Sequence, residues 1–235
     1  MKRPFDKYRD NYENVLQRSF ALPGLKPSFF TRSKSQHIRS TIQRLLGPTT
    51  ARSILDVGCG IGIMEAYLAP YFNKITAIDI AGDLLGAAKK NVAGVDFREY
   101  DGVTIPFSDQ SFDVAFAVCV LHHLPPEQQM PMLQEMKRVV RPGGAVAIYE
   151  HNPLNPLTRL TVANCEFDEH VHLVKPRQLR RLYARCGLTV DFQAYILFFP
   201  FGGSLFRRFE EAISFLPLGA QFSLWGKRGS VQDVP

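Results

Sequence analysis

An aspartate followed by three alternating glycines is the most informative pattern in the sequence. Asp56 ends an apolar run, and Gly58, Gly60 and Gly62 follow it before a segment of helix length (SILDVGCGIGIMEAYLA). Glycines permit a tight turn and let a ligand approach the backbone closely. A dinucleotide-binding turn needs its third glycine three positions after the second, where this chain has Ile63. The spacing therefore counts against a nicotinamide dinucleotide and against an oxidoreductase that would use one.

The carboxylate at this turn indicates the charge of the ligand. A pyrophosphate is best met by bare backbone N–H groups at a helix N-terminus, with no carboxylate beside them. S-adenosylmethionine carries an ammonium and a sulfonium at its methionine end, and Asp56 suits that positive charge. The unit of strand, aspartate, GxGxG and helix therefore favours S-adenosylmethionine. A capping role for Asp56 at the turn is the structural alternative.

This unit and the motifs after it resemble the class I S-adenosylmethionine-dependent methyltransferases. DVGCGIG is similar to the first motif of that family, and FDVAFAVCVLHHL and RVVRPGGAVAIYE are similar to later ones. The resemblance covers about residues 52–150 and is strongest to a small-molecule subgroup with LHHL and RPGG motifs, which includes quinone-ring methylating enzymes. It implies an α/β fold with a Rossmann-like, seven-stranded, mostly parallel sheet, helices on both faces and an antiparallel last strand.

The resemblance also implies which residues bind the cofactor. Asp79 stands where the family has an acidic residue that contacts both ribose hydroxyls, and Asp101 where a side chain contacts the adenine amino group. In this subgroup the segment before the first strand folds over the cofactor, although a packing role for its residues is an equal alternative. The implied cofactor-binding residues are Asp56, Gly58, Cys59, Gly60, Gly62, Asp79, Ile80, Asp101, Gly102, Val118, Cys119, His123, Tyr8, Tyr12 and Arg32.

Histidines near strand ends are the candidates for acceptor chemistry. Methyl transfer is an in-line displacement at an activated sulfonium, so the enzyme aligns the acceptor and, where the acceptor is protonated, supplies a base. His123 and its neighbour His122 follow the fourth predicted strand, and His151 follows the fifth. Histidine titrates near neutrality, which suits a base. We expect His151 and His123 to be catalytic, with packing beside the cofactor as the alternative for the LHHL pair.

The sequence does not predict a metal site. His170 and His172 form an HxH pair near Glu166, Asp168 and Glu169, but no third ligand stands at a clear spacing. The four cysteines form no CxxC pair, and we expect them to be reduced thiols. They are Cys59, Cys119, Cys165 and Cys186.

The elements that must position these residues alternate along the chain from Arg52 onward. Apolar runs of strand length cover 53–57, 75–80, 95–100, 112–121, 144–150, 188–195 and 221–227. Helices are predicted at about 34–46, 62–70, 82–92, 127–140 and 175–186. This alternation is typical of a parallel sheet covered on both faces. We expect a helical cap at 1–50 and one methyltransferase domain at 51–235, with acceptor-side insertions at about 152–174 and 196–220, the second an aromatic hairpin.

Composition and charge indicate which kinds of ligand the protein suits and where in the cell it is expected. The chain of 235 residues carries 28 Lys and Arg against 22 Asp and Glu, a net charge of +6 that suits an anionic ligand, an acidic membrane surface or a nucleic acid. The basic cluster KPRQLRRLYAR is interpreted as a solvated helix face. The polar N-terminus lacks the pattern of a secretory signal and no run is long and apolar enough to span a membrane, so a cytoplasmic protein is expected.

Motifs that are missing point to a small-molecule acceptor. No (N/D)PP(Y/F/W) tetrapeptide follows the fourth strand, and no nucleic-acid-binding module is recognisable, so DNA is not an expected partner. An oxygen or carbon of a small molecule remains as the methyl acceptor. The aromatic segment 196–222 favours an apolar or lipid-linked acceptor and leaves peripheral membrane contact open. The alternatives are a non-catalytic S-adenosylmethionine-binding module and an RNA or protein methyltransferase; the sequence does not indicate the oligomeric state.

Overall fold

The computed structural model describes residues 12–19, 26–169, 171–199 and 204–229. Two helices precede the sheet, α1 (Tyr12–Ser19) and α2 (Pro27–Leu46). The remaining helices are α3 (Ile63–Leu68), α4 (Gly82–Asn91), α5 (Pro126–Val139), α6 (Pro156–Ala163), α7 (Pro176–Arg185) and α8 (Ser204–Ile213). Short 3-10 turns include η3 (Ala69–Tyr71), η4 (Leu121–His123) and η5 (Glu166–Asp168).

Seven strands form one sheet in the order β3-β2-β1-β4-β5-β7-β6. Their bounds are β1 (Ser53–Val57), β2 (Lys74–Asp79), β3 (Val95–Glu99), β4 (Phe112–Val118), β5 (Val140–His151), β6 (Leu188–Ile196) and β7 (Gln221–Arg228). The pairs from β3 to β5 are parallel, and β7 runs antiparallel to both of its neighbours. The predicted fold class is therefore confirmed. The order reverses between β1 and β4, and ligands of such sheets bind beyond the carboxyl ends of the strands at this point.

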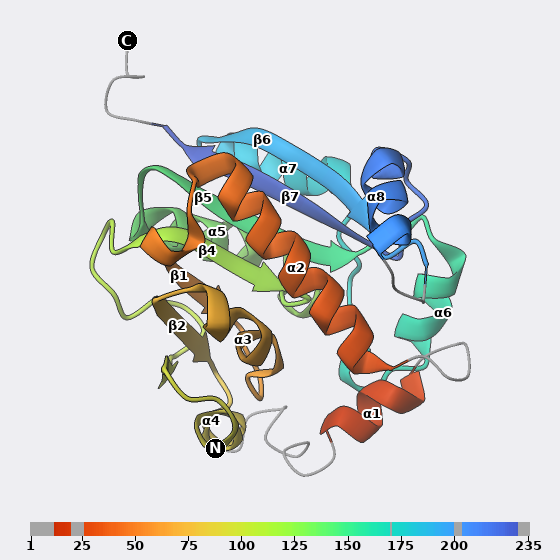
Figure 1. Cartoon of the computed structure of the whole chain (residues 1–235), viewed down its shortest axis with the longest axis horizontal. Helices are drawn as coiled ribbons and strands as arrows, with labels where there is room; N and C mark the ends of the chain where they lie inside the picture. Colours follow the sequence, from red (N-terminus) through yellow and green to blue (C-terminus); the bar gives the residue numbers. More distant parts are fainter. Residues whose placement is uncertain (1–11, 20–25, 170, 200–203, 230–235) are drawn as a thin grey trace.

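Helices cover both faces of the sheet (Figure 1). One core lies under α2 and α3, where Ile38 and Leu68 pack with Phe116 and Trp225. A second core lies under α5 and α7, and a smaller cluster packs α4 against β2 and β3. Alternate strand residues enter opposite cores, because successive side chains of a strand point to opposite faces. The strands other than β7 thus hold their carboxyl ends at fixed positions on one edge of the sheet.

The predicted elements differ from the observed ones mainly at their ends. The helix expected from residue 34 begins at Pro27, which occupies the first helical turn, where proline is favoured. The fourth strand ends at Val118 rather than at residue 121, because Cys119 has a φ of 57° and η4 follows. These shifts leave the predicted site residues that follow the strands at the edge where the strands end.

The segment expected to form an aromatic hairpin contains a helix instead. In the described part of 196–220, residues Ser204–Ile213 form α8, and no hairpin of paired strands is formed there. Phe206, Phe209 and Ile213 recur at three- and four-residue intervals, which is the period of a helix rather than the alternation of a strand. The insertion is therefore helical, and the hairpin prediction was wrong.

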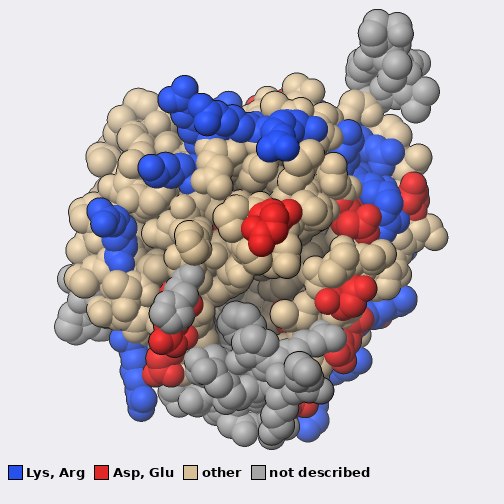
Figure 2. All heavy atoms as spheres, turned by 180° about the vertical axis from the view of Figure 1, so that it is seen from behind, with Lys and Arg blue, Asp and Glu red and all other residues tan. Residues whose placement is uncertain are grey.

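The cluster of basic residues lies on α7, as predicted. Lys and Arg side chains gather along the edge of the face shown in Figure 2 that carries α7. Leu179, Leu182 and Tyr183 are buried on the opposite side of that helix. The exposed basic residues are Lys175, Arg177, Arg180, Arg181 and Arg185. None of the described helices is both long and apolar enough to cross a membrane.

Candidate functional site

The glycine turn forms a side-chain-free cradle at the end of β1. Gly58, Gly60 and Gly62 all have positive φ angles, of 91°, 57° and 79°. The amides of Gly58 and Cys59 both donate to the carbonyl oxygen of Ile78, at 2.7 and 3.2 Å, which holds the turn against β2. Because L residues rarely adopt this backbone region, glycine is strongly favoured at the turn. The cradle therefore presents bare backbone at the point where the strand order reverses.

Two carboxyl groups are buried beside the cradle without complete hydrogen bonding. Asp56 is 2% exposed and Glu65, on α3, is fully buried. Asp56 Oδ1 and both Glu65 carboxylate oxygens have no hydrogen-bond partner among the described residues. Burial raises the pKa of both groups, and the negative charge of Glu65 raises the pKa of Asp56 further. Buried acceptors without donors are costly, so this arrangement fits a ligand that brings a charged N–H donor.

Replacing Glu65 is expected to raise the stability of the fold and to weaken ligand binding. A raised carboxyl pKa means that the folded protein holds a proton that the unfolded chain gives up near pH ~4. This contribution to stability is complete below that pH and is lost as pH rises through the raised pKa of the pair. Glu65→Gln removes the like charge and can donate to Asp56, so the free energy of unfolding at pH 7 should rise by about 1 kcal/mol.

The same variant should bind S-adenosylhomocysteine at least tenfold more weakly, because the neutral amide of glutamine lacks the negative charge that would attract the ligand's ammonium. Urea denaturation and calorimetric titration measure the two effects. Glu127→Gln, on the exposed first turn of α5, is the matched control and should change neither quantity appreciably. A Glu65→Gln protein that is less stable and binds normally would contradict this account of the buried pair.

The predicted ribose and adenine residues lie on the two strands next to the cradle. Asp79 ends β2, and its carboxylate accepts the amides of Gly60 at 2.7 Å and Ala81 at 2.8 Å. Asp101, after β3, accepts the amides of Val103 and Thr104. Through the bonds to Gly60 and Ala81, Asp79 shapes the glycine turn, and its contact with the ribose stays a prediction.

The neighbouring predicted residues are also brought together. A Cβ at Gly102, whose φ is 85°, would lie 3.2 Å from Ile80 Cγ2, so the loops after β2 and β3 touch. Val118 ends β4, and Cys119 adopts a φ of 57° directly after it. Cys119 Sγ accepts from Gln221 Nε2 at 3.2 Å. Burial would raise the pKa of Cys119, but nearby His151 brings it below its usual value.

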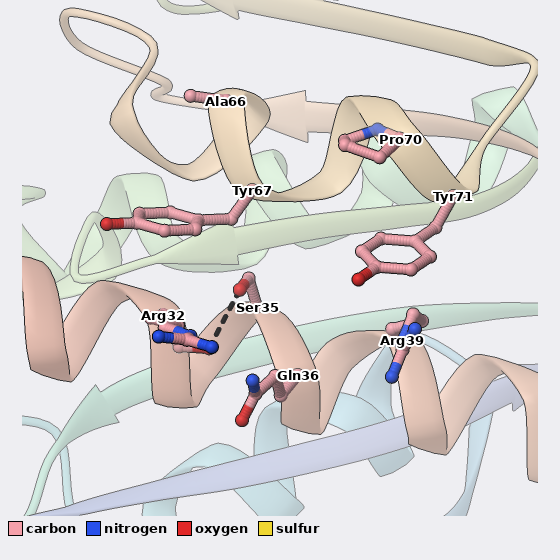
Figure 3. Close-up of a pocket in the computed structure, with 8 residues that line it drawn as sticks. All are labelled: Arg32, Ser35, Gln36, Arg39, Ala66, Tyr67, Pro70 and Tyr71. Carbon is pink, nitrogen blue, oxygen red and sulfur yellow. Dashed lines mark hydrogen bonds between the residues drawn. The ribbon is translucent and has the colours of Figure 1, made fainter.

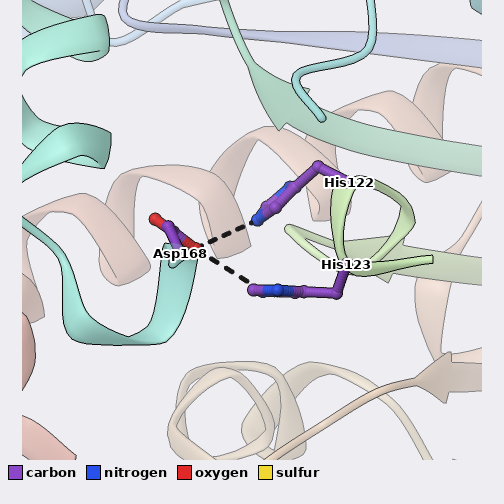
Figure 4. A group of neighbouring side chains, drawn as sticks. All are labelled: His122, His123 and Asp168. Atoms are coloured by element: carbon purple, nitrogen blue, oxygen red, sulfur yellow. Dashed lines mark hydrogen bonds and ion pairs between the residues drawn. The ribbon is translucent and has the colours of Figure 1, made fainter. Parts of the chain in front are cut away.

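A cluster of three histidines and two carboxylates lies where β4 and β5 end, and Figure 4 shows three of its members, His122, His123 and Asp168. Asp168, which ends η5, lies opposite the three imidazoles. Its Oδ1 is 3.2 Å from His122 Nε2 and 3.6 Å from His123 Nε2, and its Oδ2 is 3.9 Å from His151 Nε2. The cluster therefore joins both predicted catalytic histidines to a carboxylate from a distant loop.

The carboxylate of Glu150 supports the cluster from within the sheet. Its Oε2 lies 2.5 Å from His122 Nδ1, and its Oε1 accepts the amide of Leu121 at 2.8 Å. Burial would lower the pKa of His122, but Glu150 and Asp168 raise it well above its usual value. Burial and the charge of His122 lower the pKa of His123 to about 4. Of the two adjacent imidazoles, His122 thus favours the protonated form and His123 the neutral form.

The N-terminal candidates are placed only in part. Tyr8 lies outside the described residues, and Tyr12 begins α1. Arg32 lines a pocket of about 290 Å³ between α2 and α3, opposite Tyr67 (Figure 3). Arg39, in the same pocket, lies over the ring of Tyr71 at 4.0 Å. A cofactor contact for Arg32 stays a prediction.

Four residues with a place in this site were not predicted from the sequence. Glu65 and Glu150 are fully buried at the cradle and the histidine cluster. Lys34, on α2, adds a positive charge that acts on Asp56 and Cys119. Gln221 Nε2 also lies 3.4 Å from His151 Nδ1. A signal existed for Glu150, because an acidic residue at the carboxyl end of an apolar strand stands at the ligand-binding edge.

Comparisons with known proteins agree with this geometry. Residues 55–148 match a family model described as a methyltransferase domain. The chain is 28% identical over 212 residues to a demethylmenaquinone methyltransferase of Desulfitobacterium hafniense, covering 77% of this chain and 81% of that one. It is 33% identical over 112 residues to a phthiotriol/phenolphthiotriol dimycocerosates methyltransferase of Mycobacterium ulcerans, covering 46% of this chain but 41% of that one.

A solved structure shares the fold along nearly the whole chain. An S-adenosylmethionine-dependent methyltransferase from Thermotoga maritima superimposes with a TM-score of 0.66 at 19% identity, covering 95% of this chain and 98% of that one. The matched domain spans the glycine cradle, the buried carboxyl pair and the ends of β2 and β4, where the geometry suits a cationic ligand. Residues 55–148 therefore form a methyltransferase domain, and the comparisons support an S-adenosylmethionine-dependent methyltransferase.

Proposed function

We propose that the enzyme methylates an oxygen or carbon of an apolar, lipid-linked small molecule that it takes from a membrane surface. S-adenosylmethionine supplies the methyl group at an activated sulfonium. The chain's own task is to align the acceptor in line with that group. The exposed apolar surface beside the histidine cluster carries the proposal, because it stands where the acceptor must enter.

Exposed apolar side chains are concentrated on two segments. Of the nine large hydrophobic residues that are exposed among the described ones, seven lie within 154–160 and 206–218. Phe215 is 73% exposed and Leu218 is 64% exposed. We name this surface the apolar rim; its members are Leu154, Leu157, Leu160, Phe206, Phe209, Phe215 and Leu218. A concentration of this kind marks an interaction surface, whereas scattered exposed apolar residues are ordinary.

The two segments of the apolar rim are held together at the ligand-binding end of the sheet. Asn152 Nδ2 donates to the carbonyl oxygen of Pro217 at 3.0 Å, and Asn155 Nδ2 donates to that of Leu218 at 2.7 Å. Figure 1 places α6 and α8 at the end toward which the β4 and β5 arrows point. The rim thus borders the edge that carries the histidine cluster.

A cavity beside the rim reaches the cluster. It measures about 610 Å³ and is lined by residues from the α6 and η5 region, including Val162, Leu173 and Asp168. That volume lies in the range of small-molecule sites, which are mostly apolar with a few polar groups. An acceptor with a lipid tail could leave the tail on the rim and place its reacting head near Asp168.

Positive charge beside the rim suits an anionic lipid surface. Arg159, on α6, and Arg208, on α8, are exposed between rim residues of the same helices. A peripheral protein gains affinity from buried apolar area and from attraction to anionic lipids together. The relatives' names, which refer to demethylmenaquinone and to phthiotriol dimycocerosates, also support an apolar acceptor.

His151 and His123 remain the proposed catalytic residues on the acceptor side, and the cofactor-binding residues named above remain proposals. Both imidazoles direct Nε2 toward Asp168. His151→Ala should lower methyl transfer by about 10²- to 10⁴-fold, the usual contribution of a positioned acid or base. It should leave S-adenosylhomocysteine affinity within about twofold. Incorporation of label from methyl-labelled S-adenosylmethionine into a lipid extract measures the first, and unchanged turnover would remove His151 from the reaction.

Vesicle flotation tests the membrane part of the proposal. The wild type should float with vesicles of phosphatidylcholine and phosphatidylglycerol, and less with phosphatidylcholine alone. Leu157→Ser with Leu160→Ser should reduce the bound fraction at least tenfold while leaving cofactor affinity unchanged. Val103→Ser is the matched control, because Val103 is 70% exposed but lies outside the rim. Equal flotation of all three proteins would contradict a role for the rim.

A further inference from the structure

The histidine cluster has the geometry of a coordination shell. Three imidazole Nε2 atoms, from His122, His123 and His151, point toward the two oxygens of one carboxylate, Asp168, at 3.2, 3.6 and 3.9 Å. One ligand atom each from His122, His123 and Asp168 lie within 4.8 Å of one another. Figure 4 shows these three side chains converging from η4 and from the loop after α6. The neighbouring LHHL residues thus act together with a residue more than forty positions away.

We propose that His122, His123 and Asp168 bind one divalent transition-metal ion and leave its fourth position open. Zinc takes imidazole nitrogen and carboxylate oxygen at about 2.0–2.2 Å, most often with tetrahedral geometry. Ligand atoms around such an ion are about 3.3 Å apart, which follows from that bond length and the tetrahedral angle. The separations of 3.2 and 3.6 Å to Asp168 Oδ1 agree with this spacing.

A second observation is that Glu150 contacts the ring nitrogen of His122 that faces away from Asp168. Metal-bound histidines almost always donate their other ring N–H to a carboxylate or a carbonyl. Glu150 Oε2 lies 2.5 Å from His122 Nδ1, which directs Nε2 toward the cluster's centre. Glu150 Oε1 in turn accepts the amides of Leu121 and His122, so its carboxylate is held by η4. His122 is therefore oriented before any ion arrives.

The alternative is an ion pair that needs no metal. Hydrogen bonds to Asp168 need a proton on Nε2 of each imidazole, whether the ring is neutral or cationic. His122 lies between Glu150 and Asp168 and would be the cationic ring, while His123 and His151 would donate as neutral rings. One shared cation instead satisfies the two LHHL nitrogens and the carboxylate together.

The ion would act on the acceptor, and this part rests on the proposed function. A metal ion lowers the pKa of a hydroxyl that coordinates it. An acceptor hydroxyl bound there would release its proton to water, and the oxygen lone pair would form a bond to the methyl carbon. The carbon–sulfur bond would break with its electron pair on sulfur, leaving S-adenosylhomocysteine. An oxygen acceptor is thereby favoured over a carbon one.

Zinc titration of the purified protein tests the site without cofactor or acceptor. Wild type stripped with chelator should bind one zinc ion per chain with a dissociation constant on the order of micromolar or lower. His123→Ala and Asp168→Asn should each weaken binding at least tenfold. His172→Ala is the matched control, because its side chain is exposed and only its backbone amide contacts His122.

Thermal melting distinguishes loss of ligands from loss of the fold. Asp168→Asn is nearly isosteric, so it should melt near the wild-type temperature in chelator and lack the upward shift that zinc gives the wild type. No saturable zinc binding to wild type, or equal binding by the wild type and both ligand variants, would overturn the metal site. Either result would leave methyl transfer itself standing, because labelled-methyl incorporation is measured separately.

Discussion

Asp79→Ala should lower the affinity for the cofactor more than a hundredfold. The carboxylate accepts the amides of Gly60 and Ala81, so its removal frees two buried donors and loosens the glycine turn. It also removes the charged acceptor proposed for the ribose hydroxyls. Hydrogen bonds to a charged group contribute about 1.5–3 kcal/mol each, so two lost ribose contacts predict an affinity loss of more than a hundredfold. Calorimetric titration with S-adenosylhomocysteine measures it.

Two further variants test whether the loss of affinity comes from the carboxylate of Asp79. Asp79→Asn keeps one side-chain oxygen that can accept a backbone amide, so it should retain part of the turn. Its loss of affinity and its drop in melting temperature should both be smaller than those of Asp79→Ala. Asp191→Ala removes an exposed carboxylate on the far strand β6, paired with Lys227 at 3.4 Å, and should bind as the wild type does. If Asp79→Ala bound the ligand with wild-type affinity, Asp79 would have no place in the cofactor site.

Gly58→Ala should damage both stability and binding. The φ of 91° lies in a region that L residues rarely adopt, and such strain costs on the order of 1–3 kcal/mol. The new Cβ would also lie 2.4 Å from Val120 Cγ2. Val120 is β-branched, so its side chain has few ways to move aside. The variant should melt several degrees lower and bind S-adenosylhomocysteine at least a hundredfold more weakly, by scanning fluorimetry and calorimetry.

The same substitution elsewhere gives the control. Gly86 is exposed on α4, and a Cβ there would meet no atom within 4 Å. Alanine favours a helix interior over glycine by about 0.5–1 kcal/mol, so Gly86→Ala should raise the melting temperature slightly and leave binding unchanged. A Gly58→Ala protein that matched Gly86→Ala in both respects would show that the close approach at Gly58 is unimportant.

The cofactor half of the site follows from the sequence because its geometry is local. A buried strand, an aspartate and alternating glycines fix the turn after β1 within a few residues. Parallel pairing then aligns the ends of β2 and β3 with it, so that Ile80 and Gly102 become neighbours as the resemblance implied. Hydrophobic period and turn residues are enough to locate such elements.

The acceptor half depends on distant segments, and the sequence located it only in part. Asp168 reaches His151 through the path of α6 and η5, which no local pattern determines. The sequence pointed to His170 and His172 as the metal-like pair, but His170 lies outside the described residues and His172 is exposed. Glu150 was missed because a buried carboxylate in an apolar strand contradicts strand preference, and its partners are the imidazole of His122 and the backbone amides of η4.

The position of β7 has a consequence for the order in which the chain folds. β7 is the last strand in sequence, yet it lies between β5 and β6 and pairs with both. The parallel strands β1 to β5 and the cradle can therefore assemble as the chain emerges from the ribosome. β6, made earlier than β7, must wait without a partner for it, with Phe222 and Trp225 still absent from the two cores. During synthesis, β6 is thus the segment most exposed to pairing with a wrong neighbour.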